Sequence, residues 1–303
     1  MRKTRIAGAF AGITIAALAL AGCNSGTPGA DPVDPGESEG DGTWFEVASE
    51  PVEVEGSPTV DAITERGKVR IGVKEDQPNL GYLDPTTGER SGFDVDIARW
   101  IAASLGYDEE DIEFSVIDSK AREDAITRGD IDYYVGTYSI TDSRKELISF
   151  AGPYFVTGQG LLVTADNDTI TGKDSLTADM TVCSATGSTS IQRIKDETPS
   201  NTEEFDKYSE CVEALKNGQV DAVTTDEAIL IGYAALEPDA LKVTGEVFSE
   251  ERYGVGIVKG DTAFVEYVNT LFTDGGDIWQ AIFDKNLGAA GVEGDQPTVD
   301  PVE

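Results

Sequence analysis

An internal repeat of fourteen residues constrains the fold of this 303-residue chain more than any other feature. Segments 125–138 (AITRGDIDYYVGTY) and 214–227 (ALKNGQVDAVTTDE) align without a gap. In each segment a helical stretch ends at a glycine, Gly129 or Gly218, and a β-rich stretch follows. Asp132 of the first segment aligns with Asp221 of the second. The repeat predicts two similar α/β halves.

The surrounding pattern extends this α/β prediction. Apolar residues in 93–106 recur at helical spacing, and Gly106 follows them. The other predicted helices cover 122–129, 190–197, 211–218 and parts of 264–288. The predicted strands cover 69–73, 112–117, 130–138, 180–185, 219–226 and 252–261. We expect three aromatic residues of the last segments to pack in the core: Tyr253, Trp279 and Phe283.

The repeat also indicates where a ligand would bind. In open α/β sheets, ligands lie beyond the carboxyl ends of the strands. The alignment places Thr137 opposite Asp226, each at the end of a predicted strand. We therefore expect a hydroxyl and a carboxylate to face each other across a cleft between two lobes.

The N-terminus has the pattern of an export signal. Basic residues precede a mostly apolar run over 6–21, which is too short to span a bilayer comfortably. This pattern predicts a signal peptide over 1–22. The run ends in LAGC, which resembles a bacterial lipobox and predicts a lipidated Cys23 that anchors the protein to the membrane. The alternative is an ordinary signal peptide cleaved nearby.

Both flanks of the predicted folded body are acidic. The segment 24–58 contains nine Asp or Glu residues and no Lys or Arg. We predict a lipidated N-terminus with a disordered acidic linker over 23–58, and a disordered tail over 291–303.

Composition excludes several classes of function. The formal net charge is −34, and removal of the signal leaves 20 − 57 = −37, so no basic face is available for nucleic acid. The chain has no histidine, which removes Ser-His and Cys-His catalysis and most transition-metal sites. We expect no catalytic residues, no metal and no cofactor. If Cys23 carries lipid, Cys183 and Cys211 remain as a predicted disulfide, with two buried thiols as the alternative.

One polar stretch of the first half offers a ligand contact. In TYSITDSRKELISF (137–150), Ser143 and Glu146 fit a capping box, and Thr141 is another possible N-cap. Arg144 would lie in the first helical turn, where a cation is unfavourable unless an anion binds there. Its planar fork suits a carboxylate, and the alternative is a solvated side chain.

The second half offers matching groups. Ser188 and Thr189 open a helix whose free N–H groups suit a carboxylate, although they also suit a plain N-cap. Asp226 would bind an ammonium group or cap the following helix. Lys74 and Arg122 lie near strand ends and are either solvated or part of the same site.

Four segments in order resemble the family 3 solute-binding proteins, the polar amino-acid receptors of ABC importers. They are GFDVDIARWIAASL (92–105), YSITDSRKELISFAGPYF (138–155), GQVDAVTTDEAIL (218–230) and DIWQAIFDKNLG (277–288). The resemblance covers about residues 60–289. It implies a two-lobed periplasmic-binding-protein type II fold of the α/β class that closes over a central ligand cleft. Lobe 1 would comprise 59–156 and 253–290, and lobe 2 would comprise 157–252.

The resemblance also implies roles for individual residues. Arg144 would bind the α-carboxylate of an amino acid, helped by Ser188 and Thr189 from the other lobe. Asp226 would bind the α-ammonium group. Thr137 and Ser139 would help to hold the head group, and residues 92–97 would be structural.

Two basic residues and one position without a ring indicate the ligand specificity. Lys74 and Arg122 occupy places that are basic in the glutamate/aspartate receptors of the family, while Gln77 or Asn79 stands where a ring is often seen. Other segments resemble the glutamate-binding lipoproteins of Gram-positive actinobacteria. The resemblance therefore implies a monomeric, extracytoplasmic receptor that delivers L-glutamate, or L-aspartate, to an ABC permease. The alternatives are a glutamine or asparagine receptor, a sensor of the same fold and, least favoured because no catalytic group is evident, an enzyme.

Overall fold

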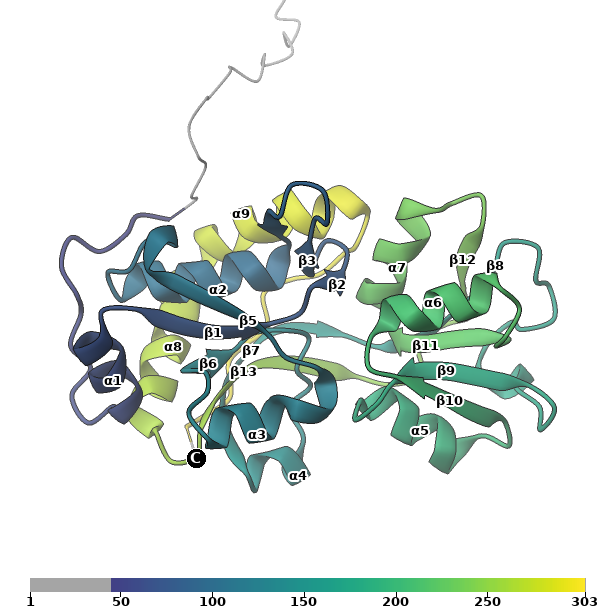
Figure 1. Cartoon of the computed structure of the whole chain (residues 1–303), viewed down its shortest axis with the longest axis horizontal. Coiled ribbons are helices and arrows are strands. Elements are labelled where there is room, and N and C mark those ends of the chain that lie inside the picture. Colours follow the sequence, from purple (N-terminus) through teal and green to yellow (C-terminus); the bar gives the residue numbers. More distant parts are fainter. Residues whose placement is uncertain (1–44, 303) are drawn as a thin grey trace, which may run out of the picture. The chain divides into compact units, whose positions relative to one another are not determined.

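The computed structural model describes residues 45–302 (Figure 1). The predicted signal peptide, Cys23 and the linker up to residue 44 lie outside the described residues. Among the described residues, two five-stranded sheets form the centres of two lobes. No helix of this part of the chain has the length and apolar character needed to cross a bilayer.

Lobe 1 is built on a sheet with the strand order β5-β1-β6-β13-β7. Its strands are β1 (Val69–Val73), β5 (Ile112–Val116), β6 (Tyr133–Tyr134), β7 (Ile148–Thr157) and β13 (Glu251–Val258). Its helices are α1 (Pro58–Arg66), α2 (Phe93–Ser104), α3 (Arg122–Thr127), α4 (Asp142–Lys145), α8 (Thr262–Asp274) and α9 (Gly276–Asn286). A small sheet of β2 (Asp76–Gln77), β3 (Gly81–Leu83) and β4 (Arg90–Ser91) lies beside α2. Helices α2 and α9 cover one face of the main sheet and α3 covers the other (Figure 1).

Lobe 2 repeats this arrangement in the strand order β10-β9-β11-β8-β12. Its strands are β8 (Gln159–Thr164), β9 (Thr181–Ala185), β10 (Asn201–Phe205), β11 (Ala222–Asp226) and β12 (Leu241–Thr244). Its helices are α5 (Thr189–Glu197), α6 (Tyr208–Lys216) and α7 (Glu227–Leu236). In each lobe three parallel strands are followed by a fourth that is antiparallel to them and a fifth that is antiparallel to the fourth. The predicted α/β class and two-lobed fold are therefore confirmed.

The fourteen-residue repeat has the same local structure in both lobes. Gly129 and Gly218 end their helices at positive φ angles of 69° and 68°. Asp132 accepts a hydrogen bond from the backbone of Arg70, and Asp221 accepts one from Thr181, each at 2.7 Å. Each aspartate therefore ties the start of its own strand to the neighbouring parallel strand.

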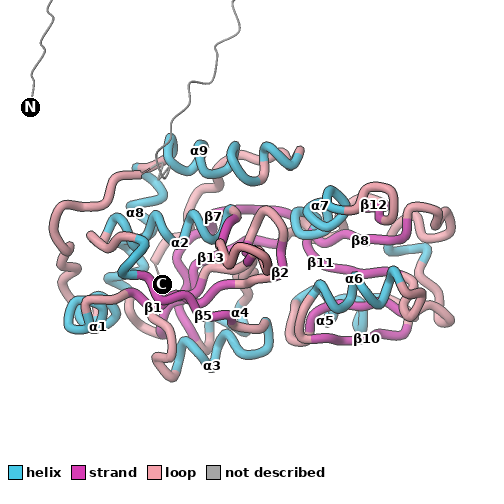
Figure 2. Tube along the Cα trace, turned by 45° about the horizontal axis from the view of Figure 1, so that its top comes forward, coloured by secondary structure: helices cyan, strands magenta, loops and turns pink. Residues whose placement is uncertain are grey.

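Two chain crossings join the lobes. The first follows β7, because β7 belongs to the lobe 1 sheet and β8 to the lobe 2 sheet. The second lies between β12 and β13. The two crossings meet where Glu251 of β13 pairs with Thr157 of β7. Figures 1 and 2 show β7 and β13 running side by side toward lobe 2.

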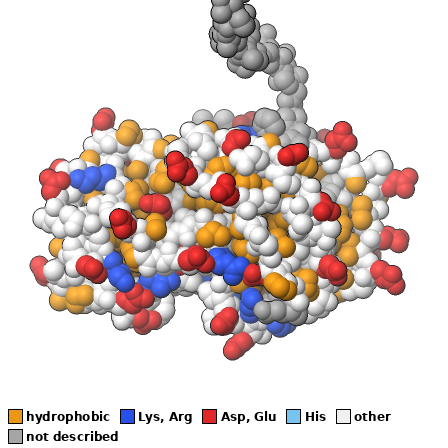
Figure 3. All heavy atoms as spheres, turned by 180° about the vertical axis from the view of Figure 1, so that it is seen from behind, with side chains coloured by type: hydrophobic (Ala, Val, Ile, Leu, Met, Phe, Trp, Pro, Cys, Tyr) orange, Lys and Arg blue, Asp and Glu red, His pale blue; other side chains and the backbone are white. Residues whose placement is uncertain are grey.

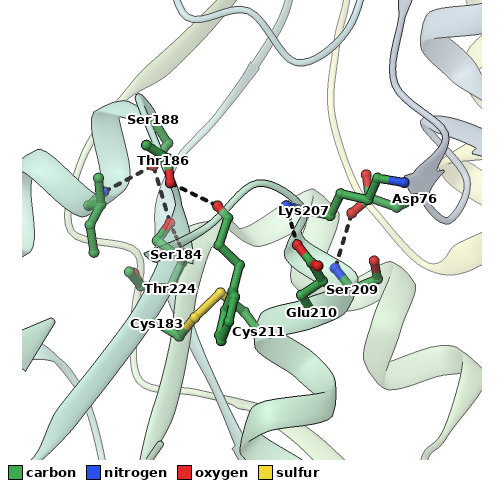
Figure 4. The surroundings of a disulfide bond; sticks show 12 residues. Asp76, Cys183, Ser184, Thr186, Ser188, Lys207, Ser209, Glu210, Cys211 and Thr224 are labelled. Atoms are coloured by element: carbon green, nitrogen blue, oxygen red, sulfur yellow. Dashed lines mark hydrogen bonds between the residues drawn. A yellow bond between two sulfur atoms is a disulfide. The ribbon is translucent and has the colours of Figure 1, made fainter. Parts of the chain in front are cut away.

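The core of each lobe explains several sequence features. Trp279 is buried and stacks on Phe283 at 5.1 Å, and its indole N–H donates to the Tyr154 carbonyl at 2.7 Å. In lobe 2 a disulfide joins Cys183 of β9 to Cys211 of α6, with both side chains buried (Figure 4). The structure therefore confirms the predicted disulfide, and the alternative of two buried thiols is wrong.

The structure corrects the predicted extent of both acidic flanks. Phe45 is buried against lobe 1, and the backbone N–H groups of Ala48 and Val52 donate to α2 residues and its cap. The tail also packs on lobe 1, since Asp300 bonds with Gly152 and Gln296 donates to the Phe272 carbonyl. Residues 45–57 and 291–302 are thus not disordered, because main-chain hydrogen bonds and a few apolar side chains hold them on lobe 1.

Two local predictions also need correction. The helix after Thr137 is a single turn, α4, and Thr141 rather than Ser143 caps it by accepting from the Arg144 N–H. The predicted strand over 130–138 is only two residues long, as β6. Beyond β6 the chain turns, and Thr137 adopts a positive φ of 47°.

Candidate functional site

Lys74 follows the last residue of β1 and lies in the interior, with 4% of its surface exposed. Its ammonium group donates to the Ser119 hydroxyl at 2.9 Å. Burial and the nearby Arg122 guanidinium lower the pKa of Lys74 to about 7. Because Lys74 is buried, the solvated alternative does not hold, and the side chain forms no ion pair with any of the residues 45–302.

Arg122 opens α3 and is 2% exposed. Its Nε–H donates to the Ser119 carbonyl at 3.0 Å. Its guanidinium lies over the rings of Tyr138 and Tyr134, 4.2 Å and 5.9 Å from their centroids. Within the described part of the chain no carboxylate pairs with it. Neither Lys74 nor Arg122 therefore has an ion-pair partner among residues 45–302, although Asp76 and Asp118 act on Lys74 from a greater distance. Burying positive charge in this way is expensive for the protein alone.

Arg144 lies in α4 and is also buried, which excludes the solvated alternative. Its guanidinium donates to the Ser139 carbonyl at 2.7 Å and to the Gly187 carbonyl of lobe 2 at 3.3 Å. It also pairs with the Glu123 carboxylate at 3.3 Å. Burial and Arg122 lower the pKa of Arg144 to about 10, so the side chain stays charged near neutral pH.

Side chains of lobe 1 hold Thr137 in the turn that follows β6. Its backbone N–H donates to Asp94 Oδ2 at 2.9 Å, and its hydroxyl bonds with the Gln77 side chain. Asp94 also accepts from the Tyr154 hydroxyl, and burial raises the pKa of Asp94 to about 7. A positive φ is costly for a threonine, so Asp94 and its helix hold a strained residue at the edge of the site. Ser139 contributes its carbonyl to Arg144 and pairs with Tyr253.

Asp226 ends β11 in lobe 2 and is 5% exposed. It precedes α7 but makes no side-chain capping bond, so the helix-cap alternative does not hold. Its Oδ2 accepts from the Tyr253 hydroxyl at 2.6 Å, while its Oδ1 is buried and accepts no hydrogen bond from residues 45–302. Burial and the Glu251 carboxylate raise the pKa of Asp226 to about 7. Arg144 and Arg122 act on it in the opposite direction, so the cations of lobe 1 are close to this acid of lobe 2.

The start of α5 supplies the remaining predicted groups. The Ser188 hydroxyl accepts from the Ile191 N–H at 3.1 Å, so the N-cap interpretation is right for this residue. The Thr189 hydroxyl donates to Glu251 Oε2 at 3.2 Å. Gly187 has a positive φ of 78°, and a Cβ there would lie 2.8 Å from Lys120 Cα of lobe 1. A glycine at this position therefore lets the two lobes approach each other.

Further contacts join the lobes at the edge of the site. Lys120 of lobe 1 pairs with Asp206 of lobe 2 at 2.5 Å. Asp76 of β2 accepts from the backbone N–H of Ser209 in α6 at 3.0 Å (Figure 4), and the Tyr233 hydroxyl of α7 donates to its carbonyl. Lys207 pairs with Glu75 beside them. A groove of about 400 Å³ runs along this contact, lined by residues of both lobes. Seen from the opposite side, the surface is notched at its lower margin, with blue Lys and Arg side chains near the notch (Figure 3).

The sequence missed several groups that complete this arrangement. Ser119 joins Lys74 to Arg122, and the Tyr138 ring lies under two guanidinium groups. Tyr253 is buried as predicted, but it also donates to Asp226. Tyr208 of α6 is buried near Asp226, and burial raises its pKa to about 12. The sequence around Tyr138, Tyr208 and Tyr253 is typical of core aromatic residues. Only the hydroxyl groups of Tyr208 and Tyr253 indicate a polar role.

The geometry defines a class of protein. Two α/β lobes, joined by two crossings, bring the buried Arg122 and Arg144 of one lobe close to the buried Asp226 of the other. A polar site enclosed between domains is typical of two-lobed ligand-binding proteins.

Comparisons with known proteins give the family. The model of the bacterial extracellular solute-binding proteins, family 3, matches residues 69–275, and the chain belongs to this family. The glutamate-binding protein GluB of Corynebacterium efficiens is 40% identical over 248 residues, covering 77% of this chain and 83% of that protein. The glutamine-binding protein of Geobacillus stearothermophilus is 43% identical over 205 residues, covering 67% and 78%. The solved structure of an ancestral arginine-binding protein bound to arginine has a TM-score of 0.67 at 34% identity, covering 74% of this chain and 99% of that one.

Proposed function

We propose that this protein binds an acidic amino acid, L-glutamate ahead of L-aspartate, between its lobes and delivers it to the permease of an ABC importer. The observation that carries the proposal is the pair Lys74 and Arg122, two buried cations that form no ion pair within residues 45–302. A side-chain carboxylate of the ligand would supply the missing anion. The similarity to GluB supports the same ligand.

The head group of the ligand would contact both lobes. Arg144 binds the α-carboxylate, with Ser188 and Thr189 on the opposite side. The α-ammonium group donates to Asp226, whose Oδ1 has no hydrogen-bond donor among the described residues. Thr137 and Ser139 line the head group from lobe 1. This part of the site serves any amino acid, so it does not determine selectivity.

Selectivity between glutamate and glutamine is the direct test. Two charge-assisted hydrogen bonds contribute about 1.5–3 kcal/mol each, so glutamate should bind at least ~100-fold more tightly than glutamine. Isothermal titration calorimetry of the wild type, Lys74→Met and Arg122→Met measures both affinities. We expect each variant to lose far more glutamate than glutamine affinity. Equal losses for the two ligands would refute the side-chain assignment.

Glutamine is the second candidate ligand. It is favoured by the similarity to the glutamine-binding protein and by the pKa of Lys74, which allows a neutral amine in part of the molecules at pH 7. Glutamine would leave Arg122 without an anion, and for that reason we place it second.

We also propose that the protein is exported and anchored through a lipid on Cys23. This proposal rests on the sequence of the N-terminus alone. Cell fractionation of the wild type and Cys23→Ala tests it. The wild type should stay with the membrane, and the variant should be released into the medium. Equal membrane retention of both would contradict the anchor.

A further inference from the structure

The Tyr138 ring lies in contact with both guanidinium groups of the candidate site. Its centroid is 4.2 Å from the Arg122 Cζ and 4.9 Å from the Arg144 Cζ. Tyr138 is itself immobilised, because it is fully buried and packs edge-on against Tyr134 and Phe150. The negative face of an aromatic ring attracts cations, and more strongly where water is excluded.

The two arginines depend on this ring to different degrees. Arg144 has two carbonyl partners and the Glu123 carboxylate, so its position is fixed without the ring. Within residues 45–302 the side chain of Arg122 donates one hydrogen bond, from Nε to the Ser119 carbonyl, and its guanidinium lies over the rings of Tyr138 and Tyr134. The two like charges repel each other, so each needs restraints to stay in place. Loss of the ring would therefore displace Arg122, which has fewer restraints, more than Arg144.

We infer that Tyr138 is a positioning residue that determines acid selectivity by holding the Arg122 guanidinium where a side-chain carboxylate reaches it. This inference rests on the proposed function and assigns part of its selectivity to a residue that touches neither end of the ligand in that proposal. Binding of glutamate would require Arg122, whereas binding of glutamine would depend mainly on Arg144 and Asp226. Tyr138 thus affects the ratio of the two affinities, which a merely structural residue would leave unchanged.

Calorimetric titration of Tyr138→Phe and Tyr138→Leu with glutamate and glutamine tests the inference. Tyr138→Phe keeps the ring and should keep the ratio of affinities within about threefold of wild type. Tyr138→Leu should reduce the ratio at least tenfold, equivalent to about 1.4 kcal/mol. Ile148→Ala is the matched control, because Ile148 is buried in the same apolar cluster and has no ring to hold Tyr138 in place. It should lower the melting temperature and leave the ratio unchanged.

Fluorinated phenylalanines at position 138 provide a second series that preserves the volume of the side chain. Each added fluorine weakens the negative face of the ring, so the glutamate/glutamine ratio should fall stepwise. An unchanged ratio in this series or in Tyr138→Leu overturns the inference while leaving the proposed function intact. A loss in Tyr138→Phe equal to that in Tyr138→Leu also overturns it, because the hydroxyl would then carry the effect. A wild type that does not bind glutamate contradicts the proposed function and the inference together.

Discussion

The pH dependence of selectivity is the most informative consequence of the buried cations. Lys74 has a pKa lowered to about 7, because it is buried and lies near Arg122. A ligand carboxylate beside Lys74 would raise that pKa again by favouring the charged amine. Binding of glutamate above pH 7 therefore requires uptake of a proton by Lys74.

The sign and size of the effect follow from this shift. Below pH 7 most molecules already carry the charge on Lys74, so this group no longer limits the binding of glutamate. At pH 8 only about one molecule in ten carries the proton before binding, so glutamate affinity should fall roughly tenfold per pH unit. Asp226 has the opposite effect on affinity below neutral pH. Its pKa is raised to about 7, and it must lose its proton to bind the ammonium group, so affinity falls as the pH falls.

Titration with glutamine controls for the protonation of Asp226. Both ligands need ionised Asp226, so the ratio of their affinities isolates Lys74. Calorimetry at pH 6.5, 7.5 and 8.5, in buffers of different ionisation enthalpy, measures the ratio and the number of protons taken up. We expect the ratio to fall about tenfold per unit above pH 7, with up to one proton taken up per glutamate. Lys74→Met should have a lower ratio that no longer varies. A constant wild-type ratio across this range would refute the reasoning.

Three further predictions concern other parts of the molecule. Asp226→Asn should weaken every amino acid at least ~100-fold, because a buried ammonium group loses its counter-ion, and calorimetry against a panel of amino acids checks this. Retained binding of any one would contradict the head-group assignment. Asp76→Ala removes the acceptor of the Ser209 N–H between the lobes and a carboxylate that raises the pKa of Lys74, so it should weaken glutamine by about 2–10-fold and glutamate by more. Equal losses would show that Asp76 acts on the contact between the lobes alone. Replacing Cys183 and Cys211 by serine should lower the free energy of unfolding by about 3.5 kcal/mol, as expected for a bridge that closes 28 residues. Equal denaturant midpoints of the oxidised and the reduced wild-type protein would contradict this stabilising role of the bridge.

The fold could be predicted because its signals are local and occur twice. The Gly129 and Gly218 caps and the Asp132 and Asp221 side chains have equivalent structural roles in the two lobes. The predicted site residues on lobe 1 are buried together for a related reason, since they follow the ends of neighbouring strands. The acidic flanks were mispredicted because a few contacts, such as those of the buried Phe45 and of the Gln296 side chain, hold them on lobe 1 and leave little trace in composition.

The supporting groups of the site could not be predicted in the same way. The sequence predicts Tyr253 as a core residue and assigns no role to Tyr138. Only the three-dimensional structure shows a guanidinium over the Tyr138 ring and a carboxylate at the Tyr253 hydroxyl. The contact of Asp76 with Ser209 joins segments 133 positions apart, which no local pattern encodes. Such groups are set by tertiary packing rather than by spacing in the sequence.

The central claim is that the buried cations Lys74 and Arg122 select an acidic side chain. Titration of the purified wild-type protein with L-glutamate and L-glutamine at pH 7, under identical conditions, tests it most directly. The account predicts saturable binding of one glutamate per chain, at least ~100-fold tighter than glutamine. Equal affinities, or tighter binding of glutamine, would contradict it.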